Sequence, residues 1–183
     1  MGAMAIAAEI GERASEEIHQ ARAKGGQARL PIACAKGCSH CCYLRVEITE
    51  AEAEVLAAAI TGSGLSRQAE VRKRASAVGS LPLEERLRAR TPCALLAADG
   101  ACSVHARRPL VCRAANSANS DACARLIAAA DPGAPLPLDI WSFASLRAAY
   151  LGFREGLAAA GRSPQRRELH LVVTEALAHL PGQ

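Results

Sequence analysis

Cysteines are the residues of this sequence with the most evident chemistry, and four of them fall within the short stretch "CAKGCSHCC". Thiolates bind zinc in tetrahedral sites and iron in clusters held by four cysteines. Thiols also act as nucleophiles, or form disulfides in oxidising compartments. Eight thiols could complete two four-cysteine sites, so the candidate metal ligands are Cys34, Cys38, Cys41, Cys42, Cys93, Cys102, Cys112 and Cys123.

The first four cysteines are spaced at i, i+4, i+7 and i+8, positions that in a helix of 3.6 residues per turn lie on one side. Their neighbours Lys36 and His40 are polar and Gly37 is a poor helix former, so this is not an apolar core face. Adjacent side chains diverge by about 100° on a helix. We therefore expect Cys41 and Cys42 to divide between two metals, or one of them to lie beside the site, and the number of centres stays open.

Charged and imidazole groups near the cysteines suggest partners for the thiolates. Lys36, His40, Arg45 and Arg113 are expected to offset the negative charge and to donate hydrogen bonds to sulfur. Imidazole also binds zinc and iron, so His40 and His105 are alternative ligands. With eight thiols available, we favour them as groups beside the ligands or on the surface. The other histidines, interpreted as surface or core residues of helices, are His19, His170 and His179.

The second cysteine-rich stretch is "CALLAADGACSVHARRPLVCR". It has two short apolar runs on either side of Asp99-Gly100, a dipeptide that favours a tight hairpin turn. Pro109 prevents the second run from continuing as a central strand. We predict a short β-hairpin that carries Cys93 and Cys102 on its strands and has Cys112 just beyond it.

Composition favours a mainly α-helical fold. Half of the 183 residues are hydrophobic, alanine is abundant, and only five residues are aromatic. We predict a single domain over residues 1–183, with a cysteine-cluster metal-binding core at 31–123 and flanking scaffold helices at 1–24 and 139–181. Helices are expected at residues 3–24, 49–60, 65–78, 82–90, 123–130, 140–160 and from 163 onward.

Local signals fix several of these helix ends. Thr49 followed by Glu52 is a capping box. Ser163-Pro164 is typical of an N-cap and first helical residue. The charged segments 65–78 and 82–90 lack a wide apolar stripe and are expected on the surface.

Charge and hydropathy narrow the classes of partner. The formal net charge is only +4, and basic residues are spread along the chain with few aromatics for base stacking, so nucleic acid is not expected. No segment has the roughly 18 consecutive apolar residues of a membrane span, and the N-terminal stretch does not have the pattern of a signal peptide. We expect a cytoplasmic protein, whose clustered thiols stay reduced and bind metal.

The cysteine pattern resembles that of the YkgJ family, small bacterial proteins described as zinc- or iron-chelating domains. The shared elements are the run "CAKGCSHCC", the "PC" and "GAC" of the second stretch, "RPLVC", and the later cysteine in "SDACAR". The resemblance covers about residues 31–123 and implies zinc or iron as the bound metal, with an iron–sulfur cluster as one form. It supplies no reaction. His105 is a departure, since many members have an aromatic residue there.

Three functions remain open from the sequence. The leading one is a metal-binding protein whose two cysteine stretches form one or two centres. The second is an iron–sulfur or iron-dependent enzyme that modifies a peptide or protein, which leaves a protein or peptide partner open. Cys34-x3-Cys38-x2-Cys41 matches the radical S-adenosylmethionine spacing, but the βα repeats of those enzymes are missing. The third is storage or delivery of a soft metal ion.

Overall fold

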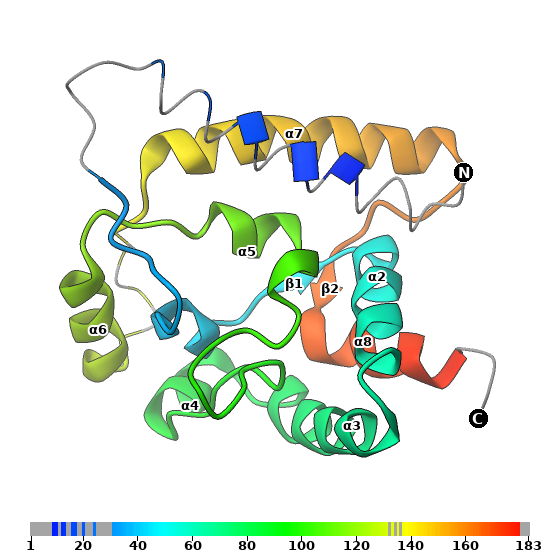
Figure 1. The fold of residues 1–183 in the computed structure, drawn as a ribbon, viewed down its shortest axis with the longest axis horizontal. Coiled ribbons are helices and arrows are strands. Elements are labelled where there is room, and N and C mark those ends of the chain that lie inside the picture. Colours follow the sequence, from blue (N-terminus) through cyan, green and yellow to red (C-terminus); the bar gives the residue numbers. More distant parts are fainter. Residues whose placement is uncertain are drawn as a thin grey trace.

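The computed structural model describes residues 9–10, 12–13, 16–17, 20, 24, 31–131, 133, 135 and 137–179, and these residues are mainly α-helical, as predicted (Figure 1). The elements are η2 (His40–Tyr43), β1 (Glu47–Ile48), α2 (Glu50–Thr61), α3 (Leu65–Gly79), α4 (Leu83–Arg88), η3 (His105–Arg107), α5 (Leu110–Ala114), α6 (Ser120–Ala129), α7 (Ile140–Ala159), β2 (Arg167–Glu168) and α8 (Leu169–His179). The predicted helix at 3–24 lies mostly outside the described residues. Among those that are described, no helix combines enough length and apolar character to span a bilayer.

Helix α2 begins at the predicted capping box. The Glu52 amide donates to Thr49 Oγ1 at 3.3 Å, and the Thr49 amide donates to Glu52 Oε2 at 2.9 Å. The second carboxylate oxygen of Glu52 accepts a hydrogen bond from the amide of Leu110 at 3.0 Å. One buried carboxylate therefore joins the start of α2 to the start of α5, close to Cys112.

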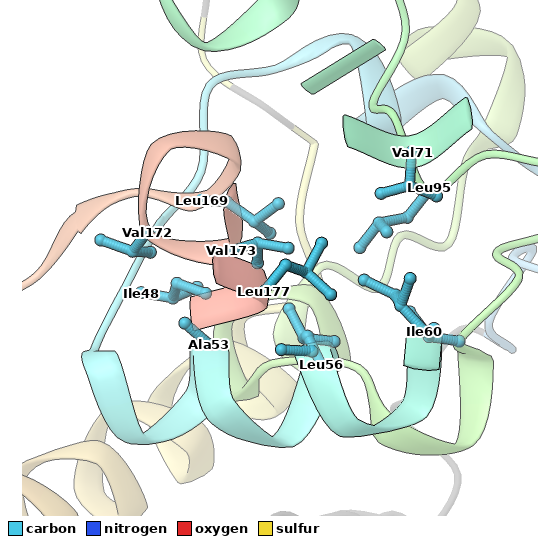
Figure 2. Close-up of a cluster of buried hydrophobic side chains, with 12 residues drawn as sticks. Ile48, Ala53, Leu56, Ile60, Val71, Leu95, Leu169, Val172, Val173 and Leu177 are labelled. Atoms are coloured by element: carbon cyan, nitrogen blue, oxygen red, sulfur yellow. The ribbon is translucent and has the colours of Figure 1, made fainter. Parts of the chain in front are cut away.

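The main core lies between α2, α3 and α8 (Figure 2). Leu56 of α2 and Leu177 of α8 belong to this cluster, and Val71 contributes to it from α3. Residues 65–78 and 82–90 form helices with many exposed residues, as expected for the surface, but each also buries a narrow side that includes Val71 in α3 and Leu87 in α4. Three small apolar residues of α3, spaced by three or four positions, are enough for its contact: Val71, Ala75 and Val78.

The small sheet pairs β1 with β2 in antiparallel register, Glu47 opposite Glu168 and Ile48 opposite Arg167. The expected helix start at Ser163-Pro164 is therefore wrong. The chain runs in non-helical conformation from residue 162 and pairs with β1 before α8 begins. The Glu168 carboxylate caps α8, since its Oε2 accepts from the amides of His170 at 2.7 Å and Leu171 at 3.0 Å.

Two smaller clusters fix the parts of the chain that carry cysteines. Apolar residues of α7 pack on α5 and on one side of α2, which positions α5 with Cys112. Leu87 of α4 and Leu126 and Ile127 of α6 pack against Tyr43 and Leu44 at the end of η2. The segment with Cys41 and Cys42 is thus held between α4 and α6.

Candidate metal centre

The N-terminal cysteine run does not form one continuous helix. Gly37 has a φ of +91°, a left-handed conformation that ends any right-handed helix and suits glycine. The amide of Cys38 donates to the carbonyl of Ala35 at 3.0 Å, which closes a turn. Only residues 40–43 are helical, as the short 3₁₀ helix η2. The first four thiols are therefore placed by a turn followed by a 3₁₀ helix rather than by one helix face.

Ser117 tethers the start of this run. The amide of Ala33 donates to the Ser117 carbonyl at 2.8 Å, and the Ser117 amide donates to Cys34 Sγ at 3.3 Å. A backbone amide directed at sulfur favours the thiolate over the thiol. Ser117 is buried in the loop between α5 and α6, and sequence reasoning did not identify it. The loop thereby brings α6, with Cys123, to the Cys34 side of the molecule.

The second cysteine stretch makes the predicted turn at Asp99-Gly100, although the hairpin is short. Leu96 and Cys102 form a single antiparallel bridge pair. Cys93 and Cys102 both pack against the main core. Each of their sulfur atoms accepts a hydrogen bond from the backbone amide two residues later, that of Leu95 and that of Val104 respectively. Both thiols thus have a backbone donor that would stabilise a bound thiolate.

Side chains from α3 hold this stretch from behind. Arg74 donates to the carbonyl of Leu96 at 2.8 Å and to that of Cys93 at 3.2 Å. Arg67 donates to Ser103 Oγ at 3.0 Å. These basic residues of α3 therefore position the hairpin and do not form only a solvated face.

The two cysteine stretches meet directly, and Figure 1 shows the segment around η2 beside the loop that leads to η3. The amide of Cys93 donates to the carbonyl of Cys42 at 2.8 Å, and Arg86 Nη2 donates to the same carbonyl at 3.0 Å. The two glycine turns also touch: a Cβ built on Gly100 would lie 3.3 Å from the carbonyl oxygen of Gly37. Segments far apart in the sequence thus form one thiol-rich region.

Within this region the charges of the thiols act on one another mainly in two sets, with Cys41 acting on both. Burial raises the pKa of Cys34, and the thiols of Cys38, Cys41 and Cys123 raise it further, against the Ser117 amide. We call these four cysteines the first thiol group. The second thiol group consists of Cys42, Cys93, Cys102 and Cys112.

Burial also dominates in the second thiol group. It raises the pKa of Cys93 to about 11 and raises those of Cys102 and Cys112. Cys41 lies between the groups, since its charge acts on Cys34, Cys102 and Cys112 alike. A hydrogen bond between the adjacent thiols lowers the pKa of Cys41 and raises that of Cys42.

Two arginines that sequence reasoning did not name as thiolate partners lie close to the thiols. The first is Arg108, whose charge favours the thiolates of Cys41, Cys102 and Cys112. Arg108 Nε is buried and has no hydrogen-bond partner. An anionic thiolate–metal centre is the kind of group that would satisfy such an N–H, so this orphaned donor fits a metal bound by the neighbouring thiols. Two residues that were expected to be partners of the thiolates, Lys36 and Arg45, have exposed side chains.

Arg86 is the second arginine and belongs to a buried polar chain. Its Nη1 lies 3.7 Å from Glu168 Oε1, and both side chains are about 2% exposed. Glu168 Oε1 accepts from His170 Nδ1 at 2.6 Å, and His170 Nε2 lies 3.3 Å from Cys93 Sγ. Burial opposes ionisation of Glu168, but the hydrogen bonds from His170 and Leu171 outweigh it and lower the pKa of Glu168. His170 is thus a core residue, as one of the two expectations had it, and it also touches a candidate ligand.

All eight cysteines are free thiols. In the part of the chain that the structure describes, no three His, Cys, Asp or Glu side chains are already grouped closely enough to hold a metal ion. Of the two candidate histidines, His40 is half-buried at the start of η2 and His105 is exposed on η3. The arrangement supplies soft sulfur donors, backbone amides for thiolates and buried positive charge, a donor set suited to zinc or iron.

Comparison with known proteins supports this chemistry. No curated protein and no solved structure shows significant similarity to the chain. One family model matches residues 33–128, more than half of the 183 residues and all eight cysteines. Its match ends before α7 and α8, so Glu168 and His170 lie outside it. The chain belongs to the family described as "CxxCxxCC: Putative zinc- or iron-chelating domain".

Proposed function

We propose that this protein binds zinc or iron at two thiolate centres, one in each thiol group. Cys34, Cys38, Cys41 and Cys123 would hold the first metal, and Cys42, Cys93, Cys102 and Cys112 the second. Zinc or iron bound by four thiolates needs no further protein ligand. The proposal includes the narrower resemblance to the YkgJ proteins and a cytoplasmic location, where thiols stay reduced.

The observation that carries the proposal is the junction between the two cysteine stretches. The hydrogen bond from the Cys93 amide to the Cys42 carbonyl makes the end of the first stretch and the beginning of the second direct neighbours. Cys42 then lies next to Cys93 and Cys112, whereas Cys41 lies at the border and acts on thiols of both groups. Four thiolates complete one zinc or iron site, so the eight cysteines around this junction are enough for two sites.

Metal binding would complete an arrangement that is partly organised already. The amides of Leu95, Val104 and Ser117 point to three of the sulfur atoms, and Arg108 has a buried N–H left without a partner. The sulfur atoms would have to draw together around the ion, since no three of the ligand-type side chains described are grouped for binding. Binding energy would therefore add to folding energy.

Metal counting on three proteins tests the proposal. The wild-type chain and two double variants, Cys34→Ser with Cys123→Ser and Cys93→Ser with Cys112→Ser, are purified anaerobically and analysed for zinc, iron and sulfide. Each double variant is the control for the other, because both lose two thiols. We expect about two four-cysteine centres in the wild type, of which each double variant loses one.

The outcomes separate the alternatives. Loss of all metal from both double variants would show one shared centre and contradict the division into two groups. A wild-type protein without zinc or iron would contradict the function itself. Iron with an equal amount of sulfide would identify clusters, whereas colourless protein with zinc would identify mononuclear sites.

A further inference from the structure

The buried chain Arg86–Glu168–His170 reaches the thiol region from the main core. Its side chains are 2–3% exposed, although charged residues are almost never fully buried unless paired. Arg86 also donates to the carbonyls of Cys42 at 3.0 Å and Thr91 at 3.3 Å, so it joins the first cysteine stretch to the residues that lead into the second. The chain ends at Cys93, the first residue of the second stretch.

The hydrogen bonds of His170 fix its ring in one orientation. The amide of Ala94 donates to His170 Nε2 at 3.2 Å, so Nε2 is the acceptor and the ring proton lies on Nδ1. Nδ1 then donates to Glu168 Oε1 at 2.6 Å. Glu168 in turn is held by two amides at the start of α8 and by Arg86. The imidazole therefore cannot rotate without breaking bonds at both nitrogens.

This orientation places the imidazole against both the sulfur of Cys93 and the backbone that follows it. His170 holds the backbone of the next residue through the Ala94 amide, and its Nε2 contacts Cys93 Sγ at 3.3 Å. We propose that His170 is a positioning residue of the second thiol group, which fixes the backbone next to Cys93, and with it the position of the Cys93 sulfur, without ligating the metal. The proposal rests on the thiolate metal binding proposed above, and it extends the site to α8, beyond residues 33–128.

Burying charged groups costs free energy, which indicates that this polar chain has a role besides stability. Replacing a buried ion pair by apolar residues of similar volume is often neutral or stabilising, so stability alone does not require Arg86, Glu168 and His170 here. Groups that hold metal ligands in place from outside the coordination shell are commonly needed for full affinity, and losing one typically costs 10–100-fold. His170, itself held by Glu168, is such a group next to the Cys93 thiol.

Cobalt(II) binding to the metal-free full-length protein under anaerobic conditions tests the proposal. Cobalt(II) replaces zinc, and its sulfur charge-transfer absorption reports how thiolates are placed around the metal. We compare wild type, His170→Ala, His170→Gln and His179→Ala, the last an exposed residue of the same helix. His170→Ala is expected to weaken cobalt binding at the second thiol group about tenfold or more and to shift the absorption. Glutamine, whose side-chain oxygen can accept from the Ala94 amide, is expected to restore part of both, and His179→Ala to change neither.

Different failures have different meanings. Wild-type protein that shows no sulfur-to-cobalt absorption would contradict thiolate binding itself. Normal wild-type binding with an unchanged affinity and spectrum for His170→Ala would overturn only the role of His170, as would a glutamine variant no better than alanine. If His170→Ala does not fold, Glu168→Gln decides, because it removes the charge and one of the two acceptor oxygens that hold the ring and the start of α8. Wild-type affinity and spectrum for that variant would overturn the proposal.

Discussion

The two thiol groups differ in the parts of the fold that hold them. The first lies on a turn, a 3₁₀ helix and α6, and is tied to the rest of the molecule by the loop residue Ser117 and by the small apolar cluster between α4, α6 and the end of η2. In the second, Cys93 and Cys102 pack against the main core, and the group is held by Arg74 of α3, Arg86 of α4 and His170 of α8. A metal in the second group should therefore act on the stability of the whole fold, and a metal in the first mainly on its local loops.

Loss of ligands should show this difference most strongly. For zinc-loaded protein, Cys93→Ser with Cys112→Ser should lower the free energy of unfolding by several kcal/mol, because the lost metal had stabilised segments attached to the core. Cys34→Ser with Cys123→Ser should lower it by clearly less. Urea denaturation under reducing conditions measures both. Equal losses would contradict the distinction between a core-linked and a loop-linked group.

Removing the arginine that supports the second thiol group should have the next largest effect on stability. Arg86→Met should destabilise the protein by about 3–5 kcal/mol, because it leaves the buried Glu168 carboxylate without its positive partner. Arg88→Met, two positions along the same helix, removes an exposed ion pair with Glu84 and should change stability by less than about 1 kcal/mol. Thermal unfolding of the two variants gives the comparison. A small effect at Arg86 would mean that α4 does not support the second group.

The number of protons released on metal binding should also differ between the two thiol groups. The metal-free thiols of Cys93, Cys102 and Cys112 have raised pKa values, so they are protonated at neutral pH and metal must displace their protons. Affinity should fall as pH falls, by about 1.4 kcal/mol per pH unit for each such thiol. The first group should release fewer protons, since Cys41 has a lowered pKa. Calorimetry of zinc binding in two buffers counts the protons for each double variant, and equal release by the two groups would contradict this ordering.

The contact between the two glycine turns should give the smallest effect. Gly37 and Gly100 both have positive φ, so alanine at either position is strained by about 1–2 kcal/mol. Only at Gly100 does the new Cβ also meet backbone, the Gly37 carbonyl oxygen at 3.3 Å, whereas nothing lies within 4 Å at Gly37. Gly100→Ala should therefore be the more destabilising of the pair in urea denaturation. If Gly37→Ala were the more destabilising variant, the close contact between the two turns would be contradicted.

Local signals were sufficient to predict much of the fold. The capping box at Thr49 and Glu52, the turn at Asp99-Gly100 and the mainly helical class depend on neighbouring residues and are confirmed. The first cysteine run is not one continuous helix, because Gly37 has a positive φ that a right-handed helix does not allow. The start of α8 was wrong because pairing with β1, far away in sequence, keeps residues 167–168 extended.

The candidate ligands could be predicted from the sequence, but the residues that hold them in place could not. Cysteine type and spacing single out the thiols, whereas Arg86 lies in "LEERLR" with nothing to distinguish it from the exposed Arg88. Glu168 and His170 likewise carry no local pattern that points to Cys93. Their role depends on how α4 and α8 pack against the second stretch, which only the folded structure contains.

Native mass spectrometry of the anaerobically purified wild-type chain counts the metals that it holds. We expect a complex that retains two metal ions, or two clusters, above the mass of the polypeptide. The double variant Cys93→Ser with Cys112→Ser should then retain one. A wild-type chain observed at the mass of the bare polypeptide, with eight reduced thiols and no zinc or iron, would contradict the proposed metal binding.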